Sequence, residues 1–463
     1  MKLKNIYIVA LLSMVLALGS CTTDDLDPTL GQQKPTEGSI TQVNELQGLL
    51  FGALDRMTSV EYYGRDFIIN GELRSDNVFA NGNSGRFLSV AQMTYLPAQS
   101  EGVWDIAYKV ISSCNFILTT DLESLEGDQD YGKHIQGQAL MLRAFAHYDL
   151  IRNYGQTYSQ GDLGVPYVKD FFYENIVEEM YPVRGTIEEN KADLYADLEQ
   201  AYVLMQDAYE DSSLEQPNKV AAKALESKIA TYFGDWDRVI EASEDVIESS
   251  KFHVIPATDY ISSFAEDAAD NSIFELAFSE SDYPGSNSLG SIYRGRSYGD
   301  IQVLTNVENL YESGDIRAEV IGYESFDSNQ TKLRNLKKYP SSQGTDNVGL
   351  LRFEEILFNY SEALLNKGRN SDALAALNEV IRERGIAEYT EIDAASLALE
   401  RRREFIFEGF RFDDLARSGQ NIEKIDPNQN FPATVVSGDY RFSLPISQSE
   451  IDANSNVVQN NGY

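Results

Sequence analysis

The feature that most limits the fold of this chain is a pattern of paired amphipathic helices that occurs twice. In the first pair, "KVAAKALESKIATYF" follows a potential N-cap, Asn218, and Gly234 separates it from "WDRVIEASEDVIESS". In the second pair, "LRFEEILFNYSEALLNKG" precedes "RNSDALAALNEVIRERG", again with a glycine at the turn. A helix, a tight turn and a second helix within about 34 residues is typical of a tetratricopeptide repeat. We therefore predict a mainly all-α fold built on tetratricopeptide-like helix pairs.

A large irregular insertion separates the two pairs. Residues 252–350 are rich in Gly, Ser, Asn, Asp and Tyr, and they contain apolar, strand-like pieces such as "SIFELAF". Long insertions in a repeat scaffold often carry the binding function. We expect short strands and ligand contacts in this insertion, and further ligand contacts in the other irregular stretch, residues 62–102.

The N-terminus has the order of an export signal. Two lysines precede an apolar run that ends at Leu18 and is too short for a membrane-spanning helix, and small residues follow. The sequence "LGSC", ending at Cys21, resembles the bacterial lipobox, which predicts cleavage before Cys21 and lipidation of its thiol and amine. Residues 1–20 are thus predicted to be a lipoprotein signal peptide and residues 21–40 a flexible lipidated tether. The alternative is an ordinary secreted protein whose cysteine falls there by chance.

The charge balance restricts the partners. Lys and Arg number 38 against 73 Asp and Glu, which gives a formal net charge of -35. A field of that sign repels phosphate backbones and anionic membrane surfaces. Nucleic acid is therefore excluded as a partner, and any membrane attachment must be covalent or inserted.

Signatures of catalysis and of cofactor binding are scarce. The chain has three histidines and lacks the HExxH, GxSxG, P-loop and dinucleotide-binding motifs. The segment "DPNQNF" from Asp426 begins like a calcium loop but lacks its later Gly and Glu. Cys114 stands at helical spacing with apolar residues, which predicts a buried, unreactive thiol. We expect no catalytic residue, cofactor or metal site, although a lipid-anchored glycosidase with paired carboxylates remains an alternative.

The densest charged motif is "ERRREFIFEGFRFDDLARSG", which begins at Glu400. On one continuous helix, Arg401, Glu404, Glu408 and Arg411 would form a single stripe of ion pairs. We expect these charges to form a partly buried network that locks the segment onto its neighbours.

This motif closely resembles the near-C-terminal signature of SusD/RagB proteins, the surface lipoproteins of Bacteroidetes nutrient-uptake systems. The segments "LRFEEILFNYSEALLNKG", "ALMLRAFAHYDLIRNYG" with "GVPYV", and the ending "FSLPISQSEIDANSNVVQNNGY" are also similar to segments of that family. All of them occur in the family's order, and the likeness extends from about residue 40 to Tyr463.

The resemblance implies a SusD-like fold in one domain over residues 41–463, with an N-terminal SusD-like part at about 41–215 and a C-terminal RagB/SusD part at about 270–463. It also implies a lipid-anchored protein on the surface of the outer membrane. Such a protein captures oligosaccharide or polysaccharide nutrient and delivers it to a SusC-like TonB-dependent transporter without cleaving it. A peptide-binding uptake lipoprotein of the RagB type is the alternative.

A glycan site needs rings that stack on sugars beside polar groups that bind hydroxyls. The segment "SDYPGSNSLGSIYRGRSYGD" supplies the first set of candidates: Tyr283, Tyr293, Arg294, Arg296 and Tyr298. Its arginines also suit an anionic sugar or a peptide carboxylate. The segment "LRSDNVFANGNSGRF" supplies a second set: Asp76, Asn81, Asn83 and Arg86. The alternative is that the side chains of the first set fill the surface of an ordered insertion.

Overall fold

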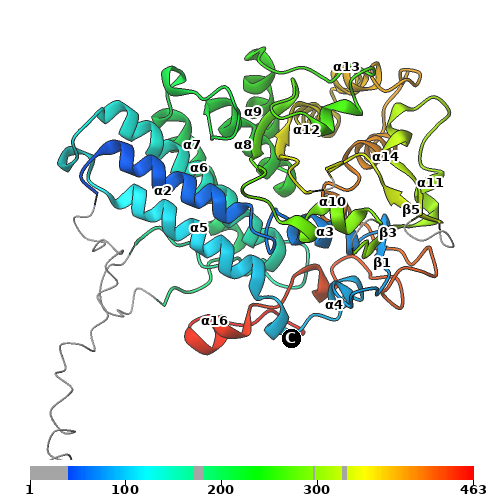
Figure 1. The fold of residues 1–463 in the computed structure, drawn as a ribbon, viewed down its shortest axis with the longest axis horizontal. Coiled ribbons are helices and arrows are strands. Elements are labelled where there is room, and N and C mark those ends of the chain that lie inside the picture. The colour runs from blue at the N-terminus through cyan, green and yellow to red at the C-terminus, as the bar shows by residue number, and fades with distance from the viewer. Residues whose placement is uncertain (1–39, 172–180, 296–297, 326–330, 342) are drawn as a thin grey trace, which may run out of the picture. The chain divides into compact units, whose positions relative to one another are not determined.

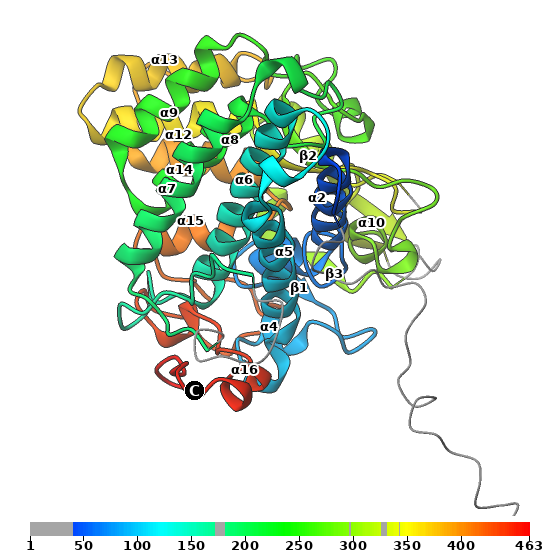
Figure 2. The same ribbon diagram turned by 90° about the vertical axis from the view of Figure 1, so that its left-hand side faces the viewer.

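Both predicted helix pairs are present in the computed structural model. Their helices are α8 (Lys219–Phe233), α9 (Trp236–Glu248), α12 (Phe353–Asn366) and α13 (Asn370–Ile381). The Oδ1 atom of Asn218 accepts a hydrogen bond from the N–H of Ala221 at 2.8 Å, and α8 ends at Gly234 with a φ of 73°. Helix α12 packs against both α8 and α9. The two pairs therefore stack on each other across the insertion (Figures 1 and 2).

A second group of helices comes from the N-terminal half of the chain. It consists of α2 (Val43–Met57), α5 (Glu101–Thr119), α6 (Gln129–Tyr154) and α7 (Ile187–Leu204). Helix α6 is buried along most of its length because it packs against α2, α5 and α7, and Figure 1 shows these helices side by side. A capping box of Thr186 and Glu189 starts α7. Cys114 of α5 is fully buried, and burial raises the pKa of its thiol to about 12, which confirms the predicted unreactive cysteine.

The irregular stretches contain short strands and short helices. The strands are β1 (Val78–Ala80), β2 (Ser272–Leu276), β3 (Ile301–Val303), β4 (Ile321–Ser325), β5 (Thr331–Asn335) and β6 (Val348–Arg352). The short helices are α3 (Asp66–Leu73), α4 (Leu88–Ala91), α10 (Leu289–Tyr293) and α11 (Thr305–Glu308). The strands form three antiparallel pairs, β1–β3, β2–β6 and β4–β5. Because β1 pairs with β3 through Phe79 and Gln302, the stretch 62–102 lies beside the insertion.

The charged motif near the C-terminus does not form one continuous helix. The helices of this part are α14 (Ala394–Phe405), α15 (Arg411–Arg417) and α16 (Gln448–Ala453). A left-handed backbone at Phe407, with φ 72°, and at Gly409, with φ 84°, separates α14 from α15. The predicted single stripe of ion pairs is therefore wrong.

The prediction of a buried ionic network is nevertheless confirmed. Arg401 contacts Asp414 of α15 at 2.8 Å, while the fully buried Glu404 accepts hydrogen bonds from Arg384 at 2.9 and 3.0 Å and from Arg352 at 3.0 Å. These partners come from other parts of the chain. The network thus joins α14 to α15, to the end of β6 and to the segment after α13.

The structure describes residues 40–171, 181–295, 298–325, 331–341 and 343–463, and residues 42–463 form one compact unit. The predicted signal peptide, the predicted tether up to residue 39, and Cys21 lie outside the described residues. In the part that the structure describes, none of the helices has the length and apolar character that crossing a membrane requires.

Candidate functional site

The β1–β3 pair brings together parts of both sets of candidate residues. The loop after β1 reaches the segment before β3, where Asn81 donates a side-chain hydrogen bond to the carbonyl of Gly299 at 2.7 Å. Ser84 donates to the carboxylate of Asp300 through its backbone N–H at 3.1 Å and its hydroxyl at 2.8 Å. Two loops that are far apart in sequence are thus fixed to each other.

Arg86 and Tyr298 form the centre of this site. The guanidinium carbon of Arg86 lies 3.8 Å from the centroid of the Tyr298 ring, and the ring remains 42% exposed. Nη1 of Arg86 donates to Oδ1 of Asn287 at 2.8 Å, and Nε lies 3.4 Å from the carboxylate of Asp300. The side chain of Asn83, an exposed residue, donates to the carbonyl of Tyr298 at 3.4 Å. These contacts hold the guanidinium group of Arg86 over one face of the Tyr298 ring.

Arg65 and Phe87 extend the site and were missed in the sequence. Arg65 donates to the same Asn287 oxygen at 3.3 Å, and its guanidinium carbon lies 5.2 Å from the centroid of the Phe87 ring. Phe87 has a left-handed backbone with a φ of 65°, a conformation that is uncommon for a bulky residue. The only signal in the sequence was that both residues fall in the irregular stretch 62–102. We call the site the Arg86–Tyr298 cluster, and its members are Arg65, Asn83, Arg86, Phe87, Asn287 and Tyr298.

Tyr283 is 43% exposed and lies on the same loop as Asn287. It remains a candidate stacking ring. Arg296 lies outside the described residues.

Two other candidates of the first set are held by contacts within the protein. Tyr293 is 1% exposed, its hydroxyl donates to the carbonyl of Phe407 at 3.3 Å, and burial raises its pKa well above the usual value. The prediction that its ring offers a stacking surface is therefore wrong, because α10 turns the ring inward against Phe407 and Tyr339. Arg294 forms an ion pair with Glu324 at 2.8 Å, so its charge already has a partner within the protein, and its contact with a ligand stays a prediction.

Asp76 is a buried structural carboxylate rather than a ligand group. It is 8% exposed and accepts hydrogen bonds from Arg411 at 2.7 and 2.9 Å, while Arg402 lies 3.2 Å away. Burial alone raises its pKa, but the two arginines outweigh burial and lower it. The prediction that Asp76 contacts a ligand is wrong because both of its oxygens already have partners.

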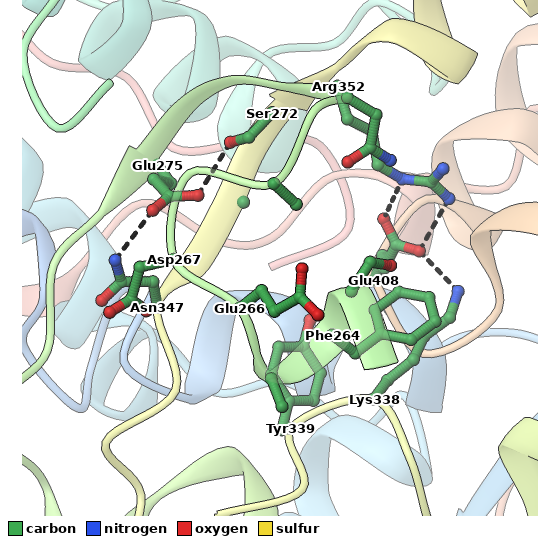
Figure 3. Close-up of a pocket in the computed structure, with 15 residues that line it drawn as sticks. Phe264, Glu266, Asp267, Ser272, Glu275, Lys338, Tyr339, Asn347, Arg352 and Glu408 are labelled. Atoms are coloured by element: carbon green, nitrogen blue, oxygen red, sulfur yellow. Dashed lines mark hydrogen bonds and ion pairs between the residues drawn. The ribbon is translucent and has the colours of Figure 1, made fainter. Parts of the chain in front are cut away.

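A separate hollow of about 80 Å³ lies beside the β2–β6 pair (Figure 3). In this view Glu275 and Glu408 stand on opposite sides, with Glu266 and Tyr339 near them. Glu275 accepts hydrogen bonds from Ser272 at 2.7 Å and Asn347 at 2.8 Å.

The Glu408 side of this hollow is charged but internally paired. Glu408 binds Lys338 and contacts Arg352 at 2.9 Å. Burial raises the pKa of Glu408, but these cations outweigh burial and lower it, so the carboxylate stays ionised at neutral pH. Among the described residues, His, Cys, Asp and Glu side chains do not gather in groups of three or more that could hold a metal ion.

Two family models match the chain in sequence. One describes starch-binding proteins associating with the outer membrane and matches residues 53–231, and the other describes the SusD family and matches residues 302–463. The fold, the helix pairs and these two matches show that the chain belongs to the SusD/RagB family. This confirms the family predicted from the sequence motifs and the predicted mainly helical fold.

Individual relatives agree with this assignment. SusD-like protein P2 of Formosa agariphila is 24% identical over 99% of both chains. Among solved structures, a SusD superfamily protein of Bacteroides thetaiotaomicron superposes with a TM-score of 0.82 at 24% identity, covering 91% of this chain and 100% of that one. A SusD-like carbohydrate binding protein of Bacteroides vulgatus superposes with a TM-score of 0.80 at 21% identity, covering 90% of this chain and 98% of that one.

Proposed function

We propose that this protein is a cell-surface lipoprotein that binds glycan oligomers at the Arg86–Tyr298 cluster and delivers them to a SusC-like TonB-dependent transporter. The cluster carries the proposal, since it places the exposed ring of Tyr298 beside guanidinium and amide donors on loops that adjoin the helical scaffold. Proteins of the same family are described as starch-binding and carbohydrate-binding, which supports glycan as the ligand.

The geometry of the cluster suits a sugar ring. Arg86 covers one face of the Tyr298 ring, so the exposed remainder of the ring can stack on the apolar C–H face of a pyranose. Hydroxyls of the same sugar would meet the amide of Asn83 and the N–H groups of Arg86. Arg65 is 8% exposed and paired with Asp66, so it serves to position Asn287. Because Asn287 fixes both guanidinium groups, these donors are oriented before the ligand arrives.

We further propose that binding occurs without cleavage. A glycosidase needs a carboxylic acid that is protonated at working pH and a second carboxylate within about 5 to 9.5 Å. Of the two buried carboxylates at the hollow of Figure 3, Glu408 is ion-paired with a lowered pKa, and Glu275 is engaged by neighbouring donors. Neither has the environment of a general acid, and the relatives are described as binding proteins.

Membrane attachment is proposed to rest on Cys21. A chain with a net charge of -35 is repelled by an anionic surface, whereas several acyl chains on one cysteine hold a protein firmly.

A calorimetric screen of the full-length protein in detergent tests the proposed ligand. The panel contains neutral oligosaccharides, acidic oligosaccharides and oligopeptides. We expect an oligosaccharide to bind and Tyr298→Ala to weaken that binding, whereas Tyr323→Ala is the matched control because Tyr323 is also exposed, at 57%, and lies outside the cluster. Binding of peptides alone would replace glycan by peptide as the nutrient. Shortening of a polysaccharide during incubation, measured by size-exclusion chromatography, would contradict the non-catalytic role.

A further inference from the structure

A larger hollow lies in the helical part of the molecule and shares no residue with the Arg86–Tyr298 cluster. Its volume is about 340 Å³, within the range of about 300 to 1,000 Å³ that small-molecule sites occupy. It lies between α12, α14 and α15, which follow one another along one side of the view in Figure 2. We call it the Arg401 pocket.

The lining of the Arg401 pocket contains two kinds of side chain. The small and apolar ones, which we call the apolar wall, are Leu365, Ala394, Ala395, Leu397 and Ala398. The charged ones, which we call the charged wall, are Glu362, Arg401, Arg411, Asp414 and Arg417. A ligand that fits must therefore have an apolar face and a charged group.

Positive charge exceeds negative charge at the charged wall. Arg417 pairs with both Glu362 and Asp414, and Arg401 also pairs with Asp414. The charged wall therefore contains two carboxylates and, with Arg411, three guanidinium groups.

The partner of Arg411 does not remove this excess. Arg411 pairs with Asp76 at 2.7 Å, but Asp76 also serves Arg402 at 3.2 Å. The next carboxyl group near both arginines is that of Glu72, and burial raises its pKa to about 7, so it cancels only part of the excess at neutral pH. The excess is notable in a chain whose net charge is -35.

Two guanidinium N–H groups at this wall lack a protein acceptor among the described residues. Arg401 is 5% exposed, its Nε donates to Asp414 and its Nη1 to Asn359, but its Nη2 donates to no protein atom there. Arg411 uses Nε and Nη2 on Asp76 and leaves Nη1 without an acceptor. Neither nitrogen is a fully buried unpartnered atom, so each is open to the pocket and can donate to water or to a bound group.

We propose that the Arg401 pocket binds a small organic carboxylate of about the size of a sugar acid. The carboxylate oxygens accept from Arg401 and Arg411, since guanidinium groups match planar carboxylates, and the apolar face of the ligand packs on Ala395 and Ala398. Inorganic phosphate would leave the apolar wall uncovered. The proposal goes beyond the handover of glycans and does not depend on it.

Calorimetry on the full-length protein with glucuronate, glucose and inorganic phosphate tests the ligand class. We expect glucuronate to bind more tightly than either of the other two. Ala398→Leu fills the pocket without removing an ion pair and should weaken glucuronate binding about tenfold or more. The matched control is Ala375→Leu, at an exposed position of α13 that does not line the pocket, and it should leave binding unchanged. Tyr298→Ala should also leave it unchanged, which separates this pocket from the glycan site.

A second pair of variants tests the charge without disturbing the ion pairs. Ser418 lies at the pocket and is exposed, so Ser418→Glu should weaken glucuronate binding about fivefold by repulsion, and Ser418→Gln should not. Two results of the calorimetry would overturn the proposal. One is that glucuronate at 10 mM does not bind, and the other is that phosphate binds as tightly as glucuronate. Equal effects of the two alanine variants, or of the two Ser418 variants, would also overturn it.

Discussion

Tyr293 and Tyr298 lie five residues apart in sequence, and the structure predicts opposite results when each is changed to alanine. Tyr293 is 1% exposed. An aromatic side chain buries about 150 to 250 Å², which at about 25 cal/mol per Å² sets an upper bound of about 4 to 6 kcal/mol. The hydrogen bond to Phe407 adds about 1 kcal/mol. Changing a buried aromatic residue to alanine typically lowers the free energy of unfolding by about 3 to 5 kcal/mol, and we expect a loss of this size for Tyr293→Ala.

Tyr298→Ala should affect binding rather than stability. The Tyr298 ring is 42% exposed and makes a cation–π contact with the guanidinium group of Arg86. At an exposed site such a contact contributes about 0.5 to 1 kcal/mol to stability. The loss of ring stacking on a sugar should reduce the binding free energy by about 0.5 to 1.5 kcal/mol, which raises the dissociation constant about 2- to 12-fold. The free energy of unfolding should therefore change by about 1 kcal/mol or less.

Two measurements on each variant decide between these roles. Urea denaturation, followed by tryptophan fluorescence, gives the free energy of unfolding, and calorimetry with the oligosaccharide from the ligand screen gives the dissociation constant. Tyr323→Ala serves as the control for a change at an exposed tyrosine elsewhere. A Tyr293→Ala variant with unchanged stability and weakened binding would refute the burial argument. A Tyr298→Ala variant with unchanged binding would remove this ring from the site.

Three further predictions follow from the buried charges and the cysteines. Glu404→Gln should lower the free energy of unfolding by about 3 to 5 kcal/mol because it removes the buried negative charge that Arg352 and Arg384 share. Glu199→Gln, at an exposed ion pair, should change it by about 1 kcal/mol or less in the same urea assay. Burial raises the pKa of Glu404, but the arginines outweigh burial and hold this pKa well below its usual range. The stability that the ionised carboxylate contributes is therefore present above about pH 4.5 and is lost in acid, so the difference between wild type and Glu404→Gln should shrink as the pH falls. Cys21→Ala should release the protein from the outer membrane without lowering its melting temperature, and retention in cells without the transporter would contradict Cys21 as the sole anchor. Cys114 should resist iodoacetamide at pH 8 in the native protein and react after denaturation, and rapid modification of the native protein would contradict its burial.

The helical scaffold was predictable because its signals are local. Asn218 as a cap, Gly234 as a helix end and the spacing of small and apolar residues all act within a few positions of each other. The break inside the C-terminal motif was not predictable from helical spacing. It depends on the left-handed Phe407, a bulky residue that does not usually adopt that conformation, and on charges whose partners lie far away in sequence.

The candidate site could be predicted only in part. Composition identified the two irregular stretches and the residues Asn83, Arg86, Tyr283 and Tyr298, which the structure places at exposed or half-buried positions. Composition could not distinguish Tyr293 from Tyr298, because which ring faces inward depends on the direction of α10. Nor could it reveal that both sets of candidates meet, because the β1–β3 pairing is a contact between distant segments.

That β1–β3 pairing has a consequence for the order in which the protein matures. The hydrogen bond from Asn81 to Gly299 joins residues 218 positions apart, so 218 further residues must be synthesised before the loop after β1 has its partner. Contacts of such long sequence separation form late, because the entropy of closing the loop must be overcome first. The helices before β3 can begin to fold before this pairing forms, but the surface that holds Tyr298 is assembled only afterwards. An N-terminal fragment that ends before residue 298 would retain helices and lack the binding surface.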